Sequence, residues 1–141
     1  MSVKMGHLAI KVKDMDASVE FYSKCFGFKK AFDIPNPSTK APWIVYLYMG
    51  GDQFFELFYG GEDLPENKGT DCGFQHICLI TEDMDKDIEN IEKGGYSLSQ
   101  QPKMGSDGNR QCWITDPNGI KIELMQLGND SLQMKIIQGK A

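Results

Sequence analysis

The sequence contains two histidines, and they occupy matching positions in an internal repeat. His7 lies in Gly-His-Leu-Ala-Ile-Lys-Val and His76 in Gln-His-Ile-Cys-Leu-Ile-Thr, and each is followed at one spacing by Asp-Met-Asp. Each copy ends in a segment that carries one glutamate, Glu56 in the first and Glu123 in the second. Two imidazoles and two carboxylates suit a divalent first-row ion such as Zn, Ni, Co, Fe or Mn. The repeat therefore predicts a metal site made by these four side chains.

Glu56 is the strongest single signal for such a site, because Phe-Phe-Glu-Leu-Phe-Tyr places its carboxylate inside an aromatic strand. A buried carboxylate stays ionised only beside a cation, a hydrogen-bond network or a metal. A lone histidine at a strand start is more often a surface residue or a satisfied core residue than a ligand. The pairing of both histidines with equivalent glutamates favours the metal interpretation, and Cys78 is interpreted as a packing residue.

Strands and helices in the same order in both halves position these residues. Alternation places His7 and Lys11 on one face of the first strand and the apolar Leu8 and Ile10 on the other. A helix follows, which begins at an aspartate and ends at a glycine in the first half. The N-cap of the first helix is Asp14 or Asp16, and this helix ends at Gly27. The second helix is expected to span 84–93. The strands are expected at 7–12, 28–32, 43–49 and 53–59 in the first half and at 75–80, 96–100, 110–115 and 120–126 in the second.

This order predicts the α+β class, with two βαβββ modules. The C-terminal tail carries an apolar patch between Leu132 and Ile137, which packs either on the body of the protein or on a partner chain. The predicted divisions are a first module at residues 1–60, a connector at 61–73, a second module at 74–127 and the tail at 128–141.

Composition excludes several partners. The chain has 141 residues, 40% of them hydrophobic, and a net charge of −5, whereas a phosphate-binding surface is basic, so we expect no nucleic-acid partner. The longest apolar stretch, 43–49, is too short to cross a membrane, so we expect no membrane partner and a cytoplasmic location. The four cysteines lack Cys-x-x-Cys spacing and are expected to be reduced.

Two basic residues flank a glycine-rich loop in the second half. Lys103 and Arg110 border Met-Gly-Ser-Asp-Gly-Asn, which either folds over a ligand and contributes positive charge or is an ordinary solvated loop. The aromatic residues are mostly core, although those on the metal-binding side would wall an apolar pocket. These aromatic residues include Trp43, Tyr46, Tyr48, Phe54, Phe58 and Trp113.

Two stretches of the sequence resemble the vicinal oxygen chelate superfamily, and within it glyoxalase I (lactoylglutathione lyase). They are Gly-His-Leu-Ala-Ile-Lys-Val-Lys-Asp-Met-Asp-Ala-Ser-Val-Glu-Phe-Tyr near the start and Asp-Pro-Asn-Gly-Ile-Lys-Ile-Glu-Leu near the end. The resemblance covers residues 5–127. It implies the glyoxalase/bleomycin resistance/dioxygenase fold, in which paired βαβββ modules form a cup-shaped open barrel with metal ligands on the first and last strand of each module.

The resemblance also implies ligands and an activity. His7, Glu56, His76 and Glu123 complete the four-ligand pattern of bacterial glyoxalase I, whereas related epimerases commonly have glutamine at the position of Glu56 and ring-cleaving dioxygenases use three ligands. The implied reaction converts the hemithioacetal of methylglyoxal and a thiol to a 2-hydroxyacyl thioester through an enediolate, with Ni, Co or Zn as the metal. Glu123 is the first choice for the base and Glu56 the alternative.

The substrate is a thiol hemithioacetal or a related α-hydroxycarbonyl, expected to meet Lys11, Lys103 and Arg110. Lys11 stands where glyoxalase I usually has an arginine and Gly60 where it has an asparagine, which leaves the thiol open. The resemblance further implies a homodimer whose sites combine modules from two chains. The alternatives are another enzyme of the superfamily (a ring-cleaving dioxygenase, an epimerase or a thiol transferase) and a protein that sequesters a small molecule.

Overall fold

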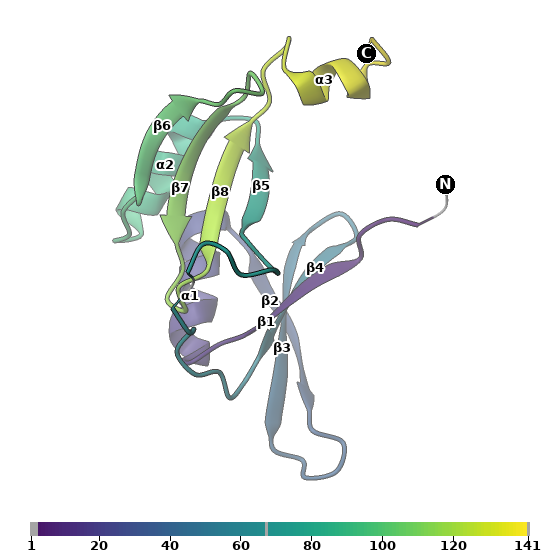
Figure 1. The fold of residues 1–141 in the computed structure, drawn as a ribbon. Helices are drawn as coiled ribbons and strands as arrows, with labels where there is room; N and C mark the ends of the chain where they lie inside the picture. Colours follow the sequence, from purple (N-terminus) through teal and green to yellow (C-terminus); the bar gives the residue numbers. More distant parts are fainter. Residues whose placement is uncertain (1–2, 67, 141) are drawn as a thin grey trace. The chain divides into compact units, whose positions relative to one another are not determined.

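The computed structural model describes residues 3–66 and 68–140 and divides the chain into two compact units, Met1–Pro65 and Glu66–Ala141. Each unit contains one βαβββ module, and a short third helix follows the second module (Figure 1). The predicted α+β class with two βαβββ modules is confirmed. The elements are β1 (His7–Lys11), α1 (Met15–Phe26), β2 (Lys29–Pro35), β3 (Pro42–Gly50) and β4 (Gln53–Phe58), then β5 (Ile77–Thr81), α2 (Met84–Lys93), β6 (Gln100–Met104), β7 (Arg110–Thr115), β8 (Lys121–Gln126) and α3 (Leu132–Ile137).

The first and last strands of each module are neighbours in its sheet. The strand order is β1-β4-β3-β2 in the first unit and β5-β8-β7-β6 in the second. The pairs β1·β4 and β5·β8 are parallel, and the remaining pairs are antiparallel. Two residues that are far apart in sequence, one near the start of a module and one near its end, therefore come side by side.

Helix α1 covers one face of the first sheet. It begins at Asp14, whose side chain accepts a hydrogen bond from the Ala17 amide at 3.0 Å, and it ends at Gly27, whose φ of 70° favours glycine. This settles the choice between the two aspartates. The Tyr22 ring packs edge-on against Phe55, with 4.8 Å between ring centroids, and both side chains are buried. The side chains of Tyr22 and Phe55 thus form part of the core between α1 and the sheet.

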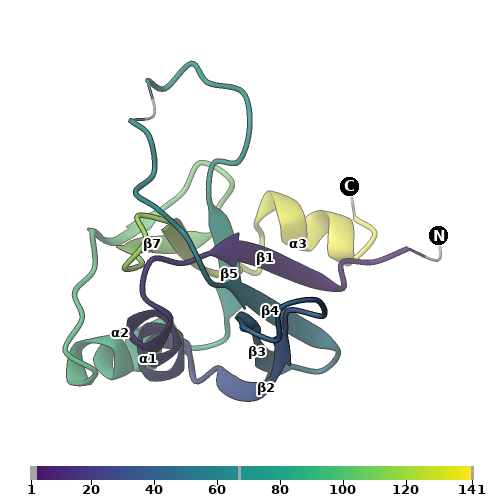
Figure 2. The same ribbon diagram turned by 90° about the horizontal axis from the view of Figure 1, so that it is seen from below.

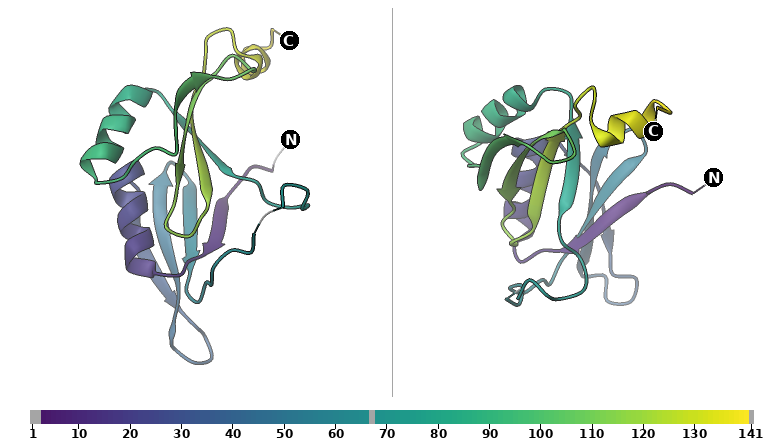
Figure 3. Two further views of the ribbon diagram at one scale, coloured as in Figure 1. Left: turned by 60° about the vertical axis from the view of Figure 1, so that its left-hand side comes forward. Right: turned by 45° about the horizontal axis from the view of Figure 1, so that its top comes forward.

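Helix α2 covers one face of the second sheet in the same way (Figure 3). Its predicted bounds, 84–93, are confirmed, and the Asp83 side chain caps its first turn by accepting from the Lys86 amide. Met84 and Ile91 on α2 and Ile122 on β8 are fully buried. Burying such side chains stabilises each one by roughly 1.5–3 kcal/mol relative to leaving it exposed.

Two edge strands differ most from their predicted ranges, and the bounds of the other strands agree to within two residues. The range 96–100 is wrong, because the Tyr96 amide bonds the Ile91 carbonyl at the end of α2, and β6 runs instead from Gln100 to Met104. Proline suggested a loop here, yet Pro102 lies inside a register shift, where its missing N–H breaks no ladder bond. In the same way β2 extends beyond 28–32 and ends at Pro35, beside another register shift.

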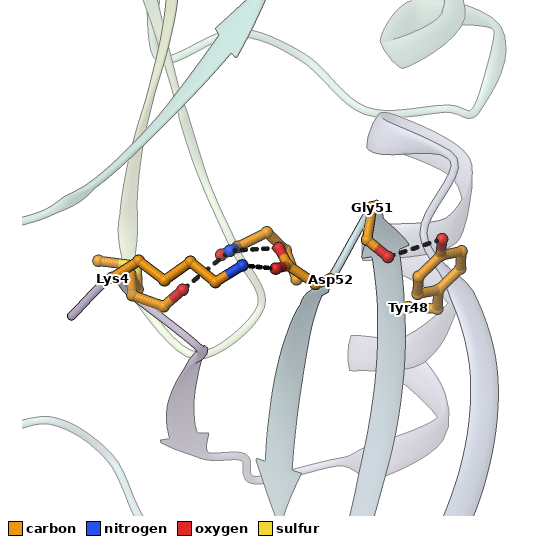
Figure 4. A network of polar contacts seen from close by, with 6 residues as sticks. Lys4, Tyr48, Gly51 and Asp52 are labelled. Carbon is orange, nitrogen blue, oxygen red and sulfur yellow. Dashed lines mark hydrogen bonds and ion pairs between the residues drawn. The ribbon is translucent and has the colours of Figure 1, made fainter. Parts of the chain in front are cut away.

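Contacts at the β3–β4 turn fix the segment before β1. Lys4 forms an ion pair with Asp52, and the Tyr48 hydroxyl donates to the Gly51 carbonyl at 3.1 Å (Figure 4). The Gln53 side chain also donates to the Met5 carbonyl at 2.9 Å. The start of β1, where His7 lies, is therefore held against the start of β4.

The remaining segments are a connector and a tail. Between β4 and β5, the described residues 59–66 and 68–76 form neither helix nor strand (Figure 2). In the tail, Ser131 caps α3 by accepting from the Met134 amide, while Leu132, Ile136 and Ile137 are exposed. Over the described ranges, no helix combines the length and the apolar character needed to cross a membrane.

Candidate metal centre

The first unit brings His7 and Glu56 together. Strands β1 and β4 run parallel with His7 across from Phe54 and Ala9 across from Glu56, so both side chains project from the face opposite α1. The distance between His7 Nε2 and Glu56 Oε1 is 3.4 Å. The side chain of Glu56 is only 8% exposed, whereas that of His7 is 54% exposed. A buried carboxylate thus lies behind an accessible imidazole.

The second unit builds the same pair from His76 and Glu123. His76 directly precedes β5, and Cys78 stands across from Glu123 in the parallel ladder between β5 and β8. The distance between His76 Nε2 and Glu123 Oε2 is 3.1 Å, and the two side chains are 38% and 13% exposed. The duplication seen in the sequence therefore produces two equivalent histidine–glutamate pairs, one in each unit.

The donor chemistry of each pair suits a divalent transition metal. An imidazole nitrogen and a carboxylate oxygen are ligands of Ni, Co and Zn, and a carboxylate this buried is stabilised by a cation. Each unit by itself offers two such donors. Across residues 3–66 and 68–140, no cluster of three or more His, Cys, Asp or Glu side chains is arranged to hold a metal ion.

Aromatic rings surround the first pair. Tyr46 stands directly opposite Glu56 in the antiparallel ladder of β3 and β4. A hydrogen bond to Glu56, together with burial and the negative charge of that carboxylate, raises the pKa of Tyr46. The Tyr46 ring stacks on Phe32 with 4.5 Å between centroids and contacts Phe54 at 6.3 Å. The Glu56 carboxylate therefore lies among aromatic rings on its face of the sheet.

A thiol and an indole surround the second pair. Burial, followed by the charge of Glu123 and a hydrogen bond to it, raises the pKa of Cys78 to about 12, so the metal-free protein keeps this thiol protonated at neutral pH. The Trp113 ring packs edge-on against the His76 imidazole, with 4.8 Å between ring centroids. The two pairs thus share a backbone plan and differ in what lies beside them.

The three basic residues expected at the substrate have different positions. Lys11 lies on β1 on the same face as His7, and Lys103 stands opposite Gln111, on the face that carries Trp113 and Glu123. Arg110 shares the helix-side face with the buried Cys112, and its guanidinium bonds Asp85 of α2 at 2.7 Å. Lys11 and Lys103 therefore lie on the same sheet face as a histidine–glutamate pair, whereas Arg110 lies on the opposite face, beside α2.

The sequence predicts no role for Gln111. Trp113 is among the aromatic residues expected to be mostly core or, on the metal-binding side, to wall an apolar pocket. One signal marks its position: Tyr46 and Trp113 are 67 residues apart, the same interval that separates Glu56 from Glu123. The repeat therefore places an aromatic ring opposite each glutamate.

A family profile and several known proteins match this chain, and they point to the same superfamily. Residues 4–124 match the sequence profile of the Glyoxalase/Bleomycin resistance protein/Dioxygenase superfamily. A probable lactoylglutathione lyase of Synechocystis is 30% identical over 128 residues, which cover 85% of this chain and 92% of that protein. A lactoylglutathione lyase of Arabidopsis thaliana is 29% identical over 125 residues, covering 86% of this chain; the chain spans only 44% of that relative's length.

Other relatives extend the comparison to a second activity and to solved structures. The human mitochondrial methylmalonyl-CoA epimerase is 25% identical over 130 residues, covering 87% of this chain and 73% of that protein. A crystal structure of a glyoxalase I mutant from Zea mays superposes with a TM-score of 0.70 at 27% identity, covering 89% of this chain and 46% of that one.

Proposed function

Because this chain belongs to the glyoxalase/bleomycin resistance protein/dioxygenase superfamily, we propose that it is a metal-dependent, glyoxalase I-like lyase. Its reaction converts the hemithioacetal of methylglyoxal and a thiol to a 2-hydroxyacyl thioester. The observation that carries the proposal is the duplicated pair, with 3.4 Å between His7 and Glu56 and 3.1 Å between His76 and Glu123. The similarity to lactoylglutathione lyases supports it.

The four paired side chains are the proposed ligands of Ni, Co or Zn. In each pair the carboxylate is more buried than the imidazole, so a bound cation would stabilise a charge that has lost most of its water. When bound, the ion supplies Lewis-acid polarisation of the two adjacent oxygens of the substrate. Aromatic residues such as Tyr46 and Phe54 would exclude water from the methyl end of the substrate.

A glutamate performs the proton transfer. The reaction is an isomerisation: a proton leaves the carbon that bears sulfur, the electron pair forms an enediolate, and the proton is returned to the neighbouring carbon. The proton of the original hydroxyl passes to the neighbouring oxygen, so that the first oxygen becomes the thioester carbonyl and the second the 2-hydroxyl. Glu123 is the proposed base. Glu56 is the alternative. Lys11 and Lys103 are the proposed contacts for the anionic end of the thiol.

We expect the enzyme to act in the cytoplasm as a homodimer. In that arrangement each site would combine His7 and Glu56 of one protomer with the partner subunit's His76 and the partner subunit's Glu123. The similar construction of the two units supports this, because each supplies one imidazole and one carboxylate.

The test is metal analysis of the purified protein, followed by an assay with methylglyoxal, glutathione and other thiols after addition of Ni, Co or Zn. We expect stoichiometric metal uptake and thioester formation that chelation abolishes and metal restores. Metal uptake without thioester formation from any thiol would contradict the isomerase assignment. Ferrous- and oxygen-dependent cleavage of catechols would indicate a dioxygenase, and tight substrate binding without turnover would indicate sequestration.

An epimerase is the second candidate, because human, bovine and mouse methylmalonyl-CoA epimerases are among the similar proteins. Epimerisation beside a thioester carbonyl uses the same removal and return of a proton. The discriminating measurement is exchange of the 2-proton of a branched acyl-CoA thioester in deuterated water. Rapid exchange with no conversion of hemithioacetals would favour the epimerase.

A further inference from the structure

Trp113 is placed against both members of the second pair. It stands directly opposite Glu123 in the antiparallel ladder between β7 and β8. Its ring meets the His76 imidazole edge-on, with 4.8 Å between centroids and an interplanar angle of 72°. Edge-to-face packing of this kind has a preferred geometry, so the indole restricts rotation of the imidazole.

Gln111 in turn fixes the indole. The Trp113 Nε1–H donates to Gln111 Oε1 at 2.9 Å. Because an indole N–H can only donate, this bond directs the oxygen of the Gln111 amide toward Trp113 and its nitrogen away. A Cβ atom added at Gly105 would lie 2.5 Å from Gln111 Nε2, so the amide is confined between the indole and the loop at residues 105–109.

The loop at residues 105–109 is held by the C-terminal tail. The buried Asn109 side chain donates to Asp107 Oδ2 and to Gln133 Oε1, both at 2.8 Å, and accepts from the Gly128 amide at 3.0 Å. Gln133 also donates to Asp107 Oδ2 at 2.9 Å. All polar atoms of this buried amide are therefore satisfied, which makes the loop a rigid support.

We propose that Gln111 and Trp113 are positioning residues that hold the His76 imidazole with its Nε2 toward Glu123, supported by the loop at residues 105–109 and the tail. The proposal rests on the proposed function in that His76 is a metal ligand. The proposal also assigns a role to the tail. The hydrogen bond between Asn109 and Gln133 fixes the tail to the loop at residues 105–109, and this loop contacts Gln111.

The first test uses the metal-free full chain. Ring-proton chemical shifts of the two histidines are measured by NMR in the wild type, Gln111→Leu, Trp113→Phe and Trp113→Leu, with His7→Gln to assign the signals. Trp43→Phe, at the other tryptophan of the chain, is the matched control. We expect Gln111→Leu and both Trp113 variants to shift the His76 signals alone, and Trp43→Phe to leave them unchanged. Unchanged His76 signals in Gln111→Leu and Trp113→Leu would overturn the proposal.

The second test measures cobalt affinity and the visible absorption spectrum of the bound cobalt. We expect Trp113→Leu to weaken binding about tenfold and to change the spectrum, because residues that orient ligands commonly contribute that much. Trp113→Phe keeps a ring and should lie between Trp113→Leu and the wild type. If the wild type binds no cobalt, the proposed function is refuted, and the NMR result still decides the positioning role. If Trp113→Leu binds cobalt with unchanged affinity and an unchanged spectrum, only the positioning role is refuted.

Discussion

Ala9 and Cys78 occupy equivalent positions, each directly across a parallel ladder from a glutamate of a histidine–glutamate pair. Ala9 faces Glu56 between β1 and β4, and Cys78 faces Glu123 between β5 and β8. The first pair forms with a methyl group at this position, so its geometry does not depend on a thiol. The comparison between the two units therefore provides a natural control for the role of the cysteine.

Replacing Cys78 by alanine removes its hydrogen bond to Glu123, but it should leave metal stoichiometry unchanged and change kcat by less than about tenfold, because a typical hydrogen bond contributes about 1 kcal/mol. The physical reason is that Ala9 already serves in the equivalent place. Metal analysis and steady-state kinetics measure both quantities. Cys78 is exposed, so the sequence-based prediction that it is a packing residue is wrong for the single unit, and loss of the metal in this variant would make Cys78 a ligand.

Replacing Glu123 by glutamine should lower kcat by at least about 100-fold, because the amide cannot accept the substrate proton. Circular dichroism and the free energy of unfolding should show a folded protein, since the substitution keeps the size of the side chain. Glu92→Gln, at an exposed position on α2, is the charge-matched control. A larger loss in Glu56→Gln than in Glu123→Gln would assign the base to Glu56.

Lys103→Gln and Arg110→Gln should have different kinetic effects, although both residues border one loop. Lys103 lies on the face of the His76–Glu123 pair, so its loss should raise KM about tenfold if it contacts the anionic end of the thiol. Arg110 is bonded to Asp85 behind the sheet, so its replacement should leave KM unchanged. Equal increases in KM would contradict the positions of these two side chains.

The loop at residues 105–109 should loosen in acid. Hydrogen bonds from Gln133 and Asn109 lower the pKa of Asp107 below its usual 3.8. A carboxyl whose folded pKa is depressed stabilises the folded state above its unfolded pKa, and that contribution is lost as the pH falls through the lower folded pKa. The difference in unfolding free energy between the wild type and Asp107→Asn should thus be constant above about pH 5 and shrink below pH 3.8. A difference that is independent of pH down to pH 3 would contradict this role.

Alternation and capping allowed much of the fold to be predicted from the sequence. The predicted ranges 84–93 and 110–115 agree with α2 and β7, because an aspartate cap and a run of strand-forming residues define them locally. The same alternation predicted that each histidine shares a face with its glutamate. Arg110 was predicted to contact the substrate because it is basic and borders the glycine-rich loop. Strand alternation, however, puts it on the same face as the buried Cys112 and Ile114, which is the helix side.

The features that could not be predicted from the sequence depend on contacts between residues far apart along the chain. Proline usually excludes a central strand, and the positions of Pro35 and Pro102 follow from β2 and β6 being sheet edges with shifted registers, which a local pattern does not encode. The contact between Asn109 and Gln133 joins residues 24 positions apart, and neither type has a distinctive spacing. The hydrogen bond from the Trp113 indole that orients Gln111 likewise has no distinctive signature in the sequence.

The parallel pairing of first and last strands links chemistry to folding. His7 and Glu56 are 49 residues apart and His76 and Glu123 are 47 apart, so neither pair exists until a nearly complete module has closed on itself. Contacts of such high sequence separation carry a loop-closure entropy cost before they contribute any stability. A partly synthesised or partly unfolded module therefore has no histidine–glutamate pair. A cation bound by both residues of a pair would stabilise the whole module against unfolding rather than a single strand.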